Sequence, residues 1–219
     1  MALAAHPGVG AITGLVLPYT LATAAQVLFE RAGGFRRGFT PQRWQGAESA
    51  NDPLYPLGAG RFGAGCNMVI RREVLAALGG FDDALDTGAP LPGGGDLDIF
   101  YRVLRAGHAL VYEPVMAVHH EHRRTLDELT HQYFTWGQGF FAFLGKVWMV
   151  EPVARPRVRR MIAWWSAWML RRLAGALVKG PNPLPVPMIA AELAGGVQGV
   201  FGEYRRSRAR LRELVGRPR

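Results

Sequence analysis

The fold is decided by the stretch GDLDIFYRVLRAGHALVYEPVMAVHHEHR, residues 95–123. Two acidic side chains, Asp96 and Asp98, stand at the start of a helical segment that Gly107 ends. An extended apolar segment follows, and it is broken at Glu113-Pro114 because the residue before a proline is restricted to extended conformations. A group of imidazoles comes at its end. This order of elements can place a general base and a metal ligand in one cleft.

Local patterns before this stretch predict further helices and strands. Residues 9–18 form an apolar run closed by a proline, which is typical of a buried strand. Residues 33–64 are rich in Gly, Pro and aromatic residues, so we expect a binding loop or a disordered segment there. The other predicted elements are helices within residues 20–31 and 72–78, a strand over residues 67–70, and a helix from Asp96 to Arg105 with Asp96 as its N-cap.

Helical patterns continue in the second half of the chain. Thr125 and Glu128 form a capping box, which predicts the start of a helix. Residues 161–178 are nearly long enough to span a bilayer, but Arg171-Arg172 in the middle makes spanning costly. We therefore expect a helix that lies in the plane of a membrane interface. The side chains expected at that interface are Trp164, Trp165 and Trp168.

The net charge of +9 is unevenly distributed along the 219 residues. From residue 151 onward there are 14 Lys and Arg against 4 Glu, which gives +10, whereas residues 1–150 hold 12 basic and 13 acidic residues, which gives −1. We therefore expect a near-neutral globular body over residues 1–150 and a basic helical tail over residues 151–219. Basic tails associate with anionic surfaces such as phospholipid or nucleic acid.

The candidate chemical residues each have a simpler structural explanation. Asp96 could be a general base or only a helix cap. His120 and His122 point to the same side of an extended segment, so they could hold a divalent metal or form a plain surface cluster. The loop around Gly65 and Asn67 could approach a ligand with its backbone, although it has neither a Walker nor a Rossmann pattern. Cys66 is expected to be a small packed residue.

These motifs together resemble the acceptor half of glycosyltransferase family 2, which consists of inverting enzymes with the GT-A fold. The resemblance covers roughly residues 9–145 and rests on the combination of motifs. The matching segments are FGAGCNMVIRREVLAALGGFD at residues 62–82, GDLD at residues 95–98, Arg102, AGH at residues 106–108, YEP at residues 112–114 and HEH at residues 120–122.

The resemblance implies a fold, a reaction and site residues. It implies an α/β fold with an incomplete GT-A mixed sheet, and transfer of a sugar from a nucleotide-sugar donor to an envelope or lipid-linked acceptor. Asp96 matches the general base that deprotonates the acceptor hydroxyl. A divalent metal, Mg or Mn, would come with the donor. The other matched positions are Asp98, Arg102, Gly65 and Asn67 for acceptor binding, and His120 and His122 for the metal.

The nucleotide-binding half of the family has no counterpart here, because no Asp-x-Asp motif precedes Asp96. We therefore expect a C-terminal portion of a transferase that is inactive alone and that a partner supplying the N-terminal half would complete. Its expected location is cytoplasmic, peripheral on the inner face of the cell membrane. A non-catalytic membrane-surface module remains the alternative. A nucleic-acid binder is disfavoured because the body is neutral and lacks a recognition motif.

Overall fold

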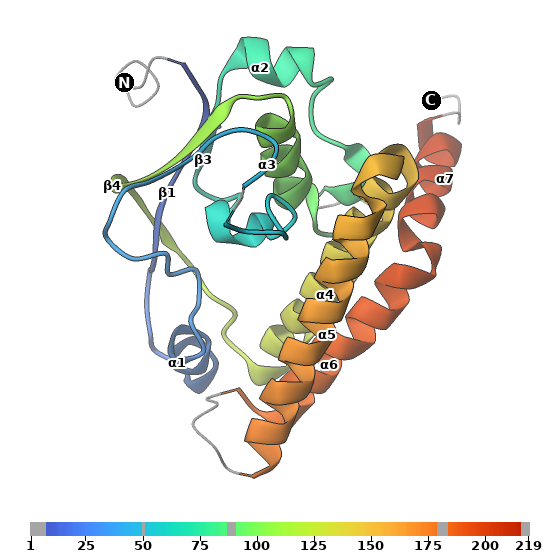
Figure 1. Ribbon diagram of the computed structural model, residues 1–219. Helices are drawn as coiled ribbons and strands as arrows, with labels where there is room; N and C mark the ends of the chain where they lie inside the picture. The colour runs from blue at the N-terminus through green and yellow to red at the C-terminus, as the bar shows by residue number, and fades with distance from the viewer. Residues whose placement is uncertain (1–7, 50, 87–90, 179–183, 216–219) are drawn as a thin grey trace. The chain divides into compact units, whose positions relative to one another are not determined.

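A computed structural model of the protein describes residues 8–49, 51–86, 91–178 and 184–215. The chain divides into two compact units, which are Met1–Phe81 with Asp96–Arg123, and Asp82–Gly95 with Arg124–Arg219. The first unit contains a mixed four-stranded sheet and the second is built of helices (Figure 1). The predicted α/β class is therefore confirmed. The packing does not separate the chain at residue 150, and the family domain boundary expected there stays a prediction.

The sheet of the first unit has the order β2-β4-β1-β3. Its two central strands, β1 (Val9–Pro18) and β4 (Ala109–His120), run parallel, and both were predicted from their apolar residues. The short strands β2 (Gln42–Trp44) and β3 (Met68–Ile70) lie antiparallel at the two edges. The predicted break at Glu113-Pro114 is a bulge, because Gly14 pairs with Glu113 while Leu15 pairs with Ala117.

Three helices accompany the sheet: α1 (Ala24–Arg31), α2 (Arg72–Ala77) and α3 (Gly95–Arg105). Helix α3 buries Ile99, Phe100, Val103 and Leu104, a spacing that places them on one side of a helix. These side chains pack with Ala11 and Leu110 of the sheet and with Phe62 of the 3-10 helix η2 (Ala59–Phe62). Ile12 follows Ala11 on β1 and Val111 follows Leu110 on β4, so their side chains point to the opposite face of the sheet. Both belong to a second buried cluster, so both faces of the central strands are covered.

The prediction that Asp96 is an N-cap was wrong by two positions. Helix α3 begins at Gly95, which places Asp96 inside the first turn. A Cβ added to Gly95 would lie 2.9 Å from the carbonyl oxygen of Leu85, so this close approach favours glycine there. Any larger side chain at position 95 would require a shift of that carbonyl.

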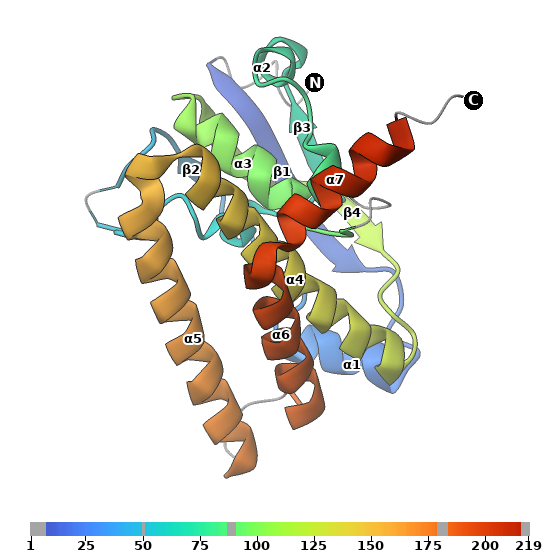
Figure 2. The same ribbon diagram turned by 90° about the vertical axis from the view of Figure 1, so that its right-hand side faces the viewer.

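The second unit contains four α-helices among its described residues. These are α4 (Leu126–Val150), α5 (Arg155–Leu177), α6 (Val186–Gln198) and α7 (Tyr204–Val215), with the short turns η3 (Asp83–Leu85), η4 (Pro152–Ala154) and η5 (Gly199–Glu203). The capping box is confirmed, because Thr125 Oγ1 accepts from the Glu128 amide and the Glu128 carboxylate accepts from the Thr125 amide. Figure 2 shows α6 lying along α4.

Glycines allow α4 and α6 to pack backbone against backbone. A Cβ on Gly195 would overlap the carbonyl oxygen of Phe134, and one on Gly137 would overlap that of Glu192. Trp165 of α5 packs against Phe141 with ring centroids 4.8 Å apart and is buried. The expectation that Trp165 faces a membrane interface was therefore wrong, because the side chain belongs to the core of this unit. Trp164 is half exposed.

Asp82 attaches the η3 turn to two helices of the same unit. Its Oδ2 accepts a 2.7 Å ion-pair contact from Lys146 of α4 and a 2.6 Å hydrogen bond from the Tyr204 hydroxyl of α7. Burial by itself raises the pKa of Asp82, but the hydrogen bonds from Lys146 and Tyr204 bring it below its ordinary value. Within the described part of the chain, no helix is long and apolar enough to cross a membrane.

We expect Gly195→Ala to lower the free energy of unfolding by about 1–3 kcal/mol, because the added methyl group overpacks the α4–α6 contact. Gly145→Ala is the matched control. A Cβ on Gly145 meets no atom within 4 Å, so this variant should gain up to about 1 kcal/mol from helix propensity. Urea unfolding followed by circular dichroism measures both. Equal effects of the two substitutions would contradict close packing at Gly195.

Candidate functional site

The loop of residues 62–67 contacts the central sheet of the first unit. Thr13 of β1 donates a short hydrogen bond from its hydroxyl to the carbonyl of Phe62. Gly63 has φ +147°, and a Cβ there would overlap the Thr13 side chain. The Gly14 amide donates to the carbonyl of Asn67 at 3.1 Å. The loop therefore follows β1 closely, and Gly63 is the position at which this approach requires glycine.

Asn67 joins the two central strands at the β4 bulge. Its Nδ2 donates to the Leu15 carbonyl at 2.9 Å and to the Met116 carbonyl at 2.8 Å. The side chain is buried. Both amide hydrogens are thus used to hold β1, β4 and the loop together. The predicted contact of Asn67 with an acceptor stays a prediction, and the structure gives this residue a structural role.

Asp96 lies at the start of α3, against the same loop. Its Oδ2 accepts from the Gly65 amide at 3.1 Å and its Oδ1 accepts from the Leu97 amide at 2.9 Å. Burial raises the pKa of Asp96 above its ordinary value, although these backbone hydrogen bonds and the nearby charge of Arg37 oppose the shift. The side chain keeps some exposure. Each carboxylate oxygen has a second lone pair, so Asp96 can still accept a proton from a hydroxyl group.

Arg37 was not identified from the sequence, and it lies near both Asp96 and Tyr112, the tyrosine of the YEP segment. The Arg37 guanidinium donates from Nε to the Gly60 carbonyl at 3.1 Å and from Nη1 to the Arg36 carbonyl at 2.8 Å, and its charge acts on both Asp96 and Tyr112. Tyr112 is fully buried, and its hydroxyl donates to the Gly38 carbonyl at 2.8 Å. Burial raises the pKa of Tyr112. Arg37 belongs to the segment 33–64, and the composition of that segment was the one sequence feature that indicated a binding loop there.

Asp98 and Arg102 form a buried clamp within the first unit. Arg102 Nε donates to Asp98 Oδ2 at 2.7 Å, and Asp98 is 1% exposed. The two terminal nitrogens of Arg102 donate at 2.8 Å to the carbonyls of Leu78 and Gly80, which follow helix α2. These contacts fix the end of α2 against α3. An acceptor-binding role for the two residues stays a prediction.

His120 and His122 come together, as their spacing predicted. Their Nδ1 atoms are 3.1 Å apart, and His122 Nε2 lies 2.9 Å from Glu30 Oε1 of helix α1. The His122 ring therefore has a partner at each nitrogen, Glu30 at Nε2 and His120 at Nδ1, whereas these contacts leave His120 Nε2 unoccupied. Burial, together with the nearby charges of His122 and Arg123, lowers the pKa of His120, so it is neutral at pH 7.

The histidine pair does not contact Asp96 in the described structure. His120 pairs with Pro18 at the end of β1, whereas Asp96 is held at Gly65, beside the loop that contacts Thr13 and Gly14. None of the interactions described for His120 or Asp96 links the two. The two groups of residues are therefore held by different contacts, and the single cleft expected from the sequence stays a prediction.

The nitrogen donors present do not by themselves build a magnesium or manganese site. Both ring nitrogens of His122 already have partners, and Mg²⁺ and Mn²⁺ prefer oxygen ligands. Among the described residues, no group of three His, Cys, Asp or Glu side chains is arranged to hold a metal. Only His120 Nε2 could add to ligands supplied by a bound diphosphate. The predicted metal role of the two histidines stays a prediction.

Cys66 is exposed, so the expectation of a packed small residue was wrong. Asn67 points into the protein and its neighbour in the chain points outward. Partial desolvation, together with the nearby charge of Asp96, raises the pKa of the Cys66 thiol. The thiol thus marks the surface beside Asp96.

Comparison with known proteins supports a glycosyltransferase-like function. The chain is 31% identical over 74 residues to the pre-mycofactocin glycosyltransferases of two Mycobacterium tuberculosis strains, CDC 1551 / Oshkosh and ATCC 25618 / H37Rv. The match covers 34% of this chain and 14% of the length of each relative. No protein-family model matches the chain, and no solved structure matches it.

The raised pKa of Asp96 predicts a specific pH dependence of stability. A carboxyl group whose pKa is higher in the folded state binds its proton more tightly there. Relative to Asp96→Asn, the wild-type protein should therefore gain stability as the pH falls through the folded pKa of Asp96. The gain should level off below about pH 4, the pKa of an unfolded aspartate. Urea unfolding at a series of pH values measures the difference, and a wild-type advantage that grows with rising pH would contradict the assignment.

We expect Asn67→Ala to lower the free energy of unfolding by about 2–4 kcal/mol, because it leaves two buried carbonyls without their donor. Asn51→Ala, at an exposed turn position, is the matched control and should change stability by less than about 0.5 kcal/mol. Chemical unfolding of both variants is the measurement. A neutral Asn67→Ala would show that the strands hold their register without this side chain.

Proposed function

We propose that this chain is the acceptor-side part of an inverting glycosyltransferase of family 2. It would act with a nucleotide-sugar donor and a carbohydrate or lipid-linked acceptor of the cell envelope. The observation that carries the proposal is the Asp96 carboxylate, oriented by the Gly65 amide at the start of α3 and made more basic by burial. The likeness to the pre-mycofactocin glycosyltransferases supports the same class of reaction.

Asp96 would remove the proton of the acceptor hydroxyl as the oxygen attacks the anomeric carbon of the donor sugar. The new bond forms on the face opposite the diphosphate, the bond to the diphosphate breaks, and the configuration inverts. A base is more effective when its pKa approaches the working pH, so the raised pKa of Asp96 suits this step. The two backbone hydrogen bonds hold the carboxylate in one orientation while its remaining lone pairs face the acceptor.

The proposed reaction includes a divalent metal that is bound together with the donor. We expect Mg²⁺ or Mn²⁺ to accompany the nucleotide sugar and to offset the negative charge of the departing diphosphate. His120 Nε2 is the one imidazole nitrogen that its contacts leave available for that complex.

We propose that the protein works at the cytoplasmic face of the cell membrane as a peripheral protein. The balance of +10 from residue 151 onward supports an anionic surface as a partner. Exposed aliphatic side chains on the same helices, such as Leu170 and Leu177, support a lipid surface over nucleic acid, because they bury well among acyl chains and do not stack on bases.

The transferase proposal predicts that Asp96→Asn abolishes sugar transfer without unfolding the protein. General bases contribute roughly 10²–10⁴-fold to rate, so incorporation should fall by at least about 100-fold. The measurement is transfer of radiolabelled sugar to membrane acceptors in cells whose own copy is replaced by the variant. Asp83→Asn, which changes an exposed carboxylate of the second unit, is the matched control and should retain full transfer.

Unchanged transfer in Asp96→Asn, with normal amounts of folded protein, would contradict the assignment of Asp96 as the base. Sugar transfer could also stay unchanged when the gene for this protein is deleted, while the wild-type protein, where present, is found on membranes. The non-catalytic membrane-surface module would then be the better description.

A further inference from the structure

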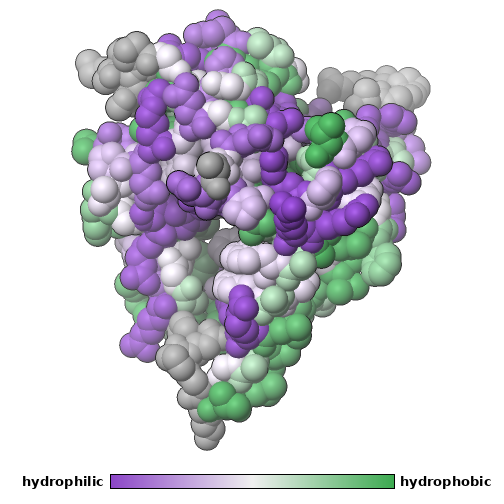
Figure 3. Space-filling view, in the orientation of Figure 1, coloured by the Kyte–Doolittle hydropathy of each residue, from purple (hydrophilic) through white to green (hydrophobic). Residues whose placement is uncertain are grey.

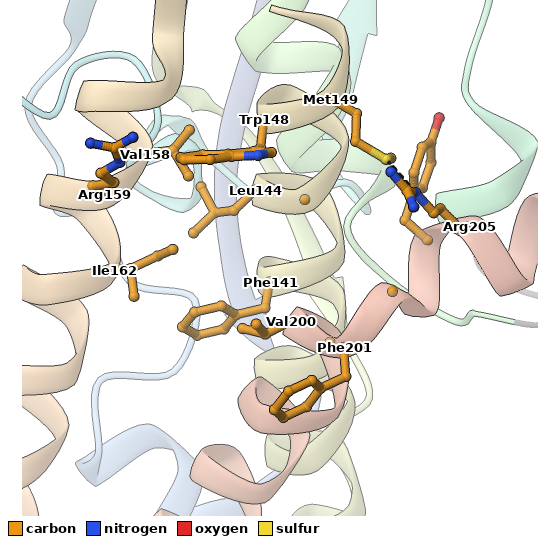
Figure 4. A pocket seen from close by; sticks show the side chains of 14 residues that line it. Phe141, Leu144, Trp148, Met149, Val158, Arg159, Ile162, Val200, Phe201 and Arg205 are labelled. Atoms are coloured by element: carbon orange, nitrogen blue, oxygen red, sulfur yellow. Dashed lines mark hydrogen bonds between the residues drawn. The ribbon is translucent and has the colours of Figure 1, made fainter. Parts of the chain in front are cut away.

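The helices of the second unit enclose an apolar groove of about 600 Å³. Helix α4, helix α5 and the η5 turn between α6 and α7 provide its walls (Figure 4). The side chains inside it are aliphatic or aromatic: Phe141, Leu144, Trp148, Val158, Ile162 and Val200. The groove has the size of a small-ligand site and offers an apolar chain a lining with few hydrogen-bonding groups.

An elbow between α6 and α7 presents apolar side chains beside this groove. Gly202 has φ +85° and ψ +20°, and Phe201 has ψ +38°, so the helix cannot continue straight through them. Phe201 is 70% exposed and Val200 is 50% exposed. Figure 3 shows apolar side chains gathered at the lower right of the view, over α5 and α6. Isolated exposed apolar residues are common, but a contiguous group beside an apolar groove indicates a binding surface.

Arginines at the rim of the groove have no acidic partner among the described residues. The guanidinium groups of Arg155 and Arg159 lie 5.4 and 5.3 Å from the ring centroid of Trp148. Arg205 Nε lies 3.0 Å from the sulfur of Met149. By contrast, Glu192 pairs with Arg172, and the buried Glu203 of the η5 turn pairs with Arg206 and Arg210 of α7. The groove is therefore apolar inside and positively charged at its edge, which complements an anionic amphiphile.

We propose that this groove and its elbow dock an anionic phospholipid of a bilayer. An acyl chain lies among the apolar side chains, the headgroup phosphate contacts the rim arginines, and Phe201 inserts beside them. A second copy of the chain would bring its own arginines against these, and like charges disfavour that contact. The inference deepens the membrane part of the proposed function, and it is independent of sugar transfer.

Vesicle flotation tests the proposal with the full chain. We expect the protein to float with vesicles that contain phosphatidylglycerol and to bind pure phosphatidylcholine vesicles at least tenfold less. Arg159→Gln with Arg205→Gln should weaken binding to the anionic vesicles about 25-fold, or about fivefold per charge removed. Phe201→Asp should weaken it by more than tenfold, because it places a charge where an apolar side chain inserts.

Matched controls lie in the first unit. Val115→Asp replaces a valine that is 89% exposed, and Arg43→Gln removes one exposed arginine. Both should bind vesicles like the wild-type protein. Asp96→Asn should do the same, so loss of sugar transfer and loss of vesicle binding can be told apart. Equal losses in groove and control variants would overturn the proposal. So would a wild-type protein that ignores anionic vesicles, or a dimer that Phe201→Asp dissociates in sedimentation.

Discussion

The buried Asn67 amide is the contact on which the rest of the first unit depends. The register of β1 and β4 shifts between Gly14 and Leu15, and the Asn67 side chain donates to a carbonyl of each strand at that point. Buried carbonyls need hydrogen-bond donors, so the position of the loop is determined by the strands beneath it. The same loop then supplies the Gly65 amide to Asp96. The orientation of the candidate base thus follows from a defect in strand pairing.

The elements that could be predicted from the sequence are those whose signals are local. The capping box at Thr125, the break before Pro114 and the apolar run of β1 each depend on residues a few positions apart. The contacts that build the candidate site join residues far apart in the chain. Asn67 and Met116 are 49 positions apart, and His122 and Glu30 are 92 positions apart. The spacing of residues along the chain does not indicate such pairings, which is why Arg37 and Glu30 were missed.

The second unit shows how an arginine-rich apolar helix can pack in a folded protein. In the sequence, Arg171 and Arg172 are adjacent and appear equivalent, but in the structure their environments differ. Arg172 pairs with Glu192 of α6 at 3.1 Å and lies 4.4 Å from the ring of Trp168, whereas Arg171 is exposed. Burial raises the pKa of Glu192 although Arg172 opposes the shift, so the contacts with Arg172 offset only part of the cost of desolvating this carboxylate. The pair neutralises Arg172, whereas Arg159 and Arg205 beside the groove keep their positive charge without such a partner among the described residues.

The glycine before the candidate base changes how that base is tuned. A glutamate at position 95 would place a second negative charge beside Asp96, and like charges raise a carboxyl pKa. Here the close approach of Leu85 favours glycine, and burial is the main cause of the raised pKa of Asp96. Desolvation depends on the loop of residues 62–67 staying in place, because Gly65 both covers the carboxylate and donates to it. An acceptor bound against this loop would exclude more water from Asp96 and raise its pKa further. Asp96 would then be more basic at the moment when it removes the proton of the acceptor hydroxyl. The strand defect, the glycine loop and the reactivity of one carboxylate are therefore parts of a single arrangement.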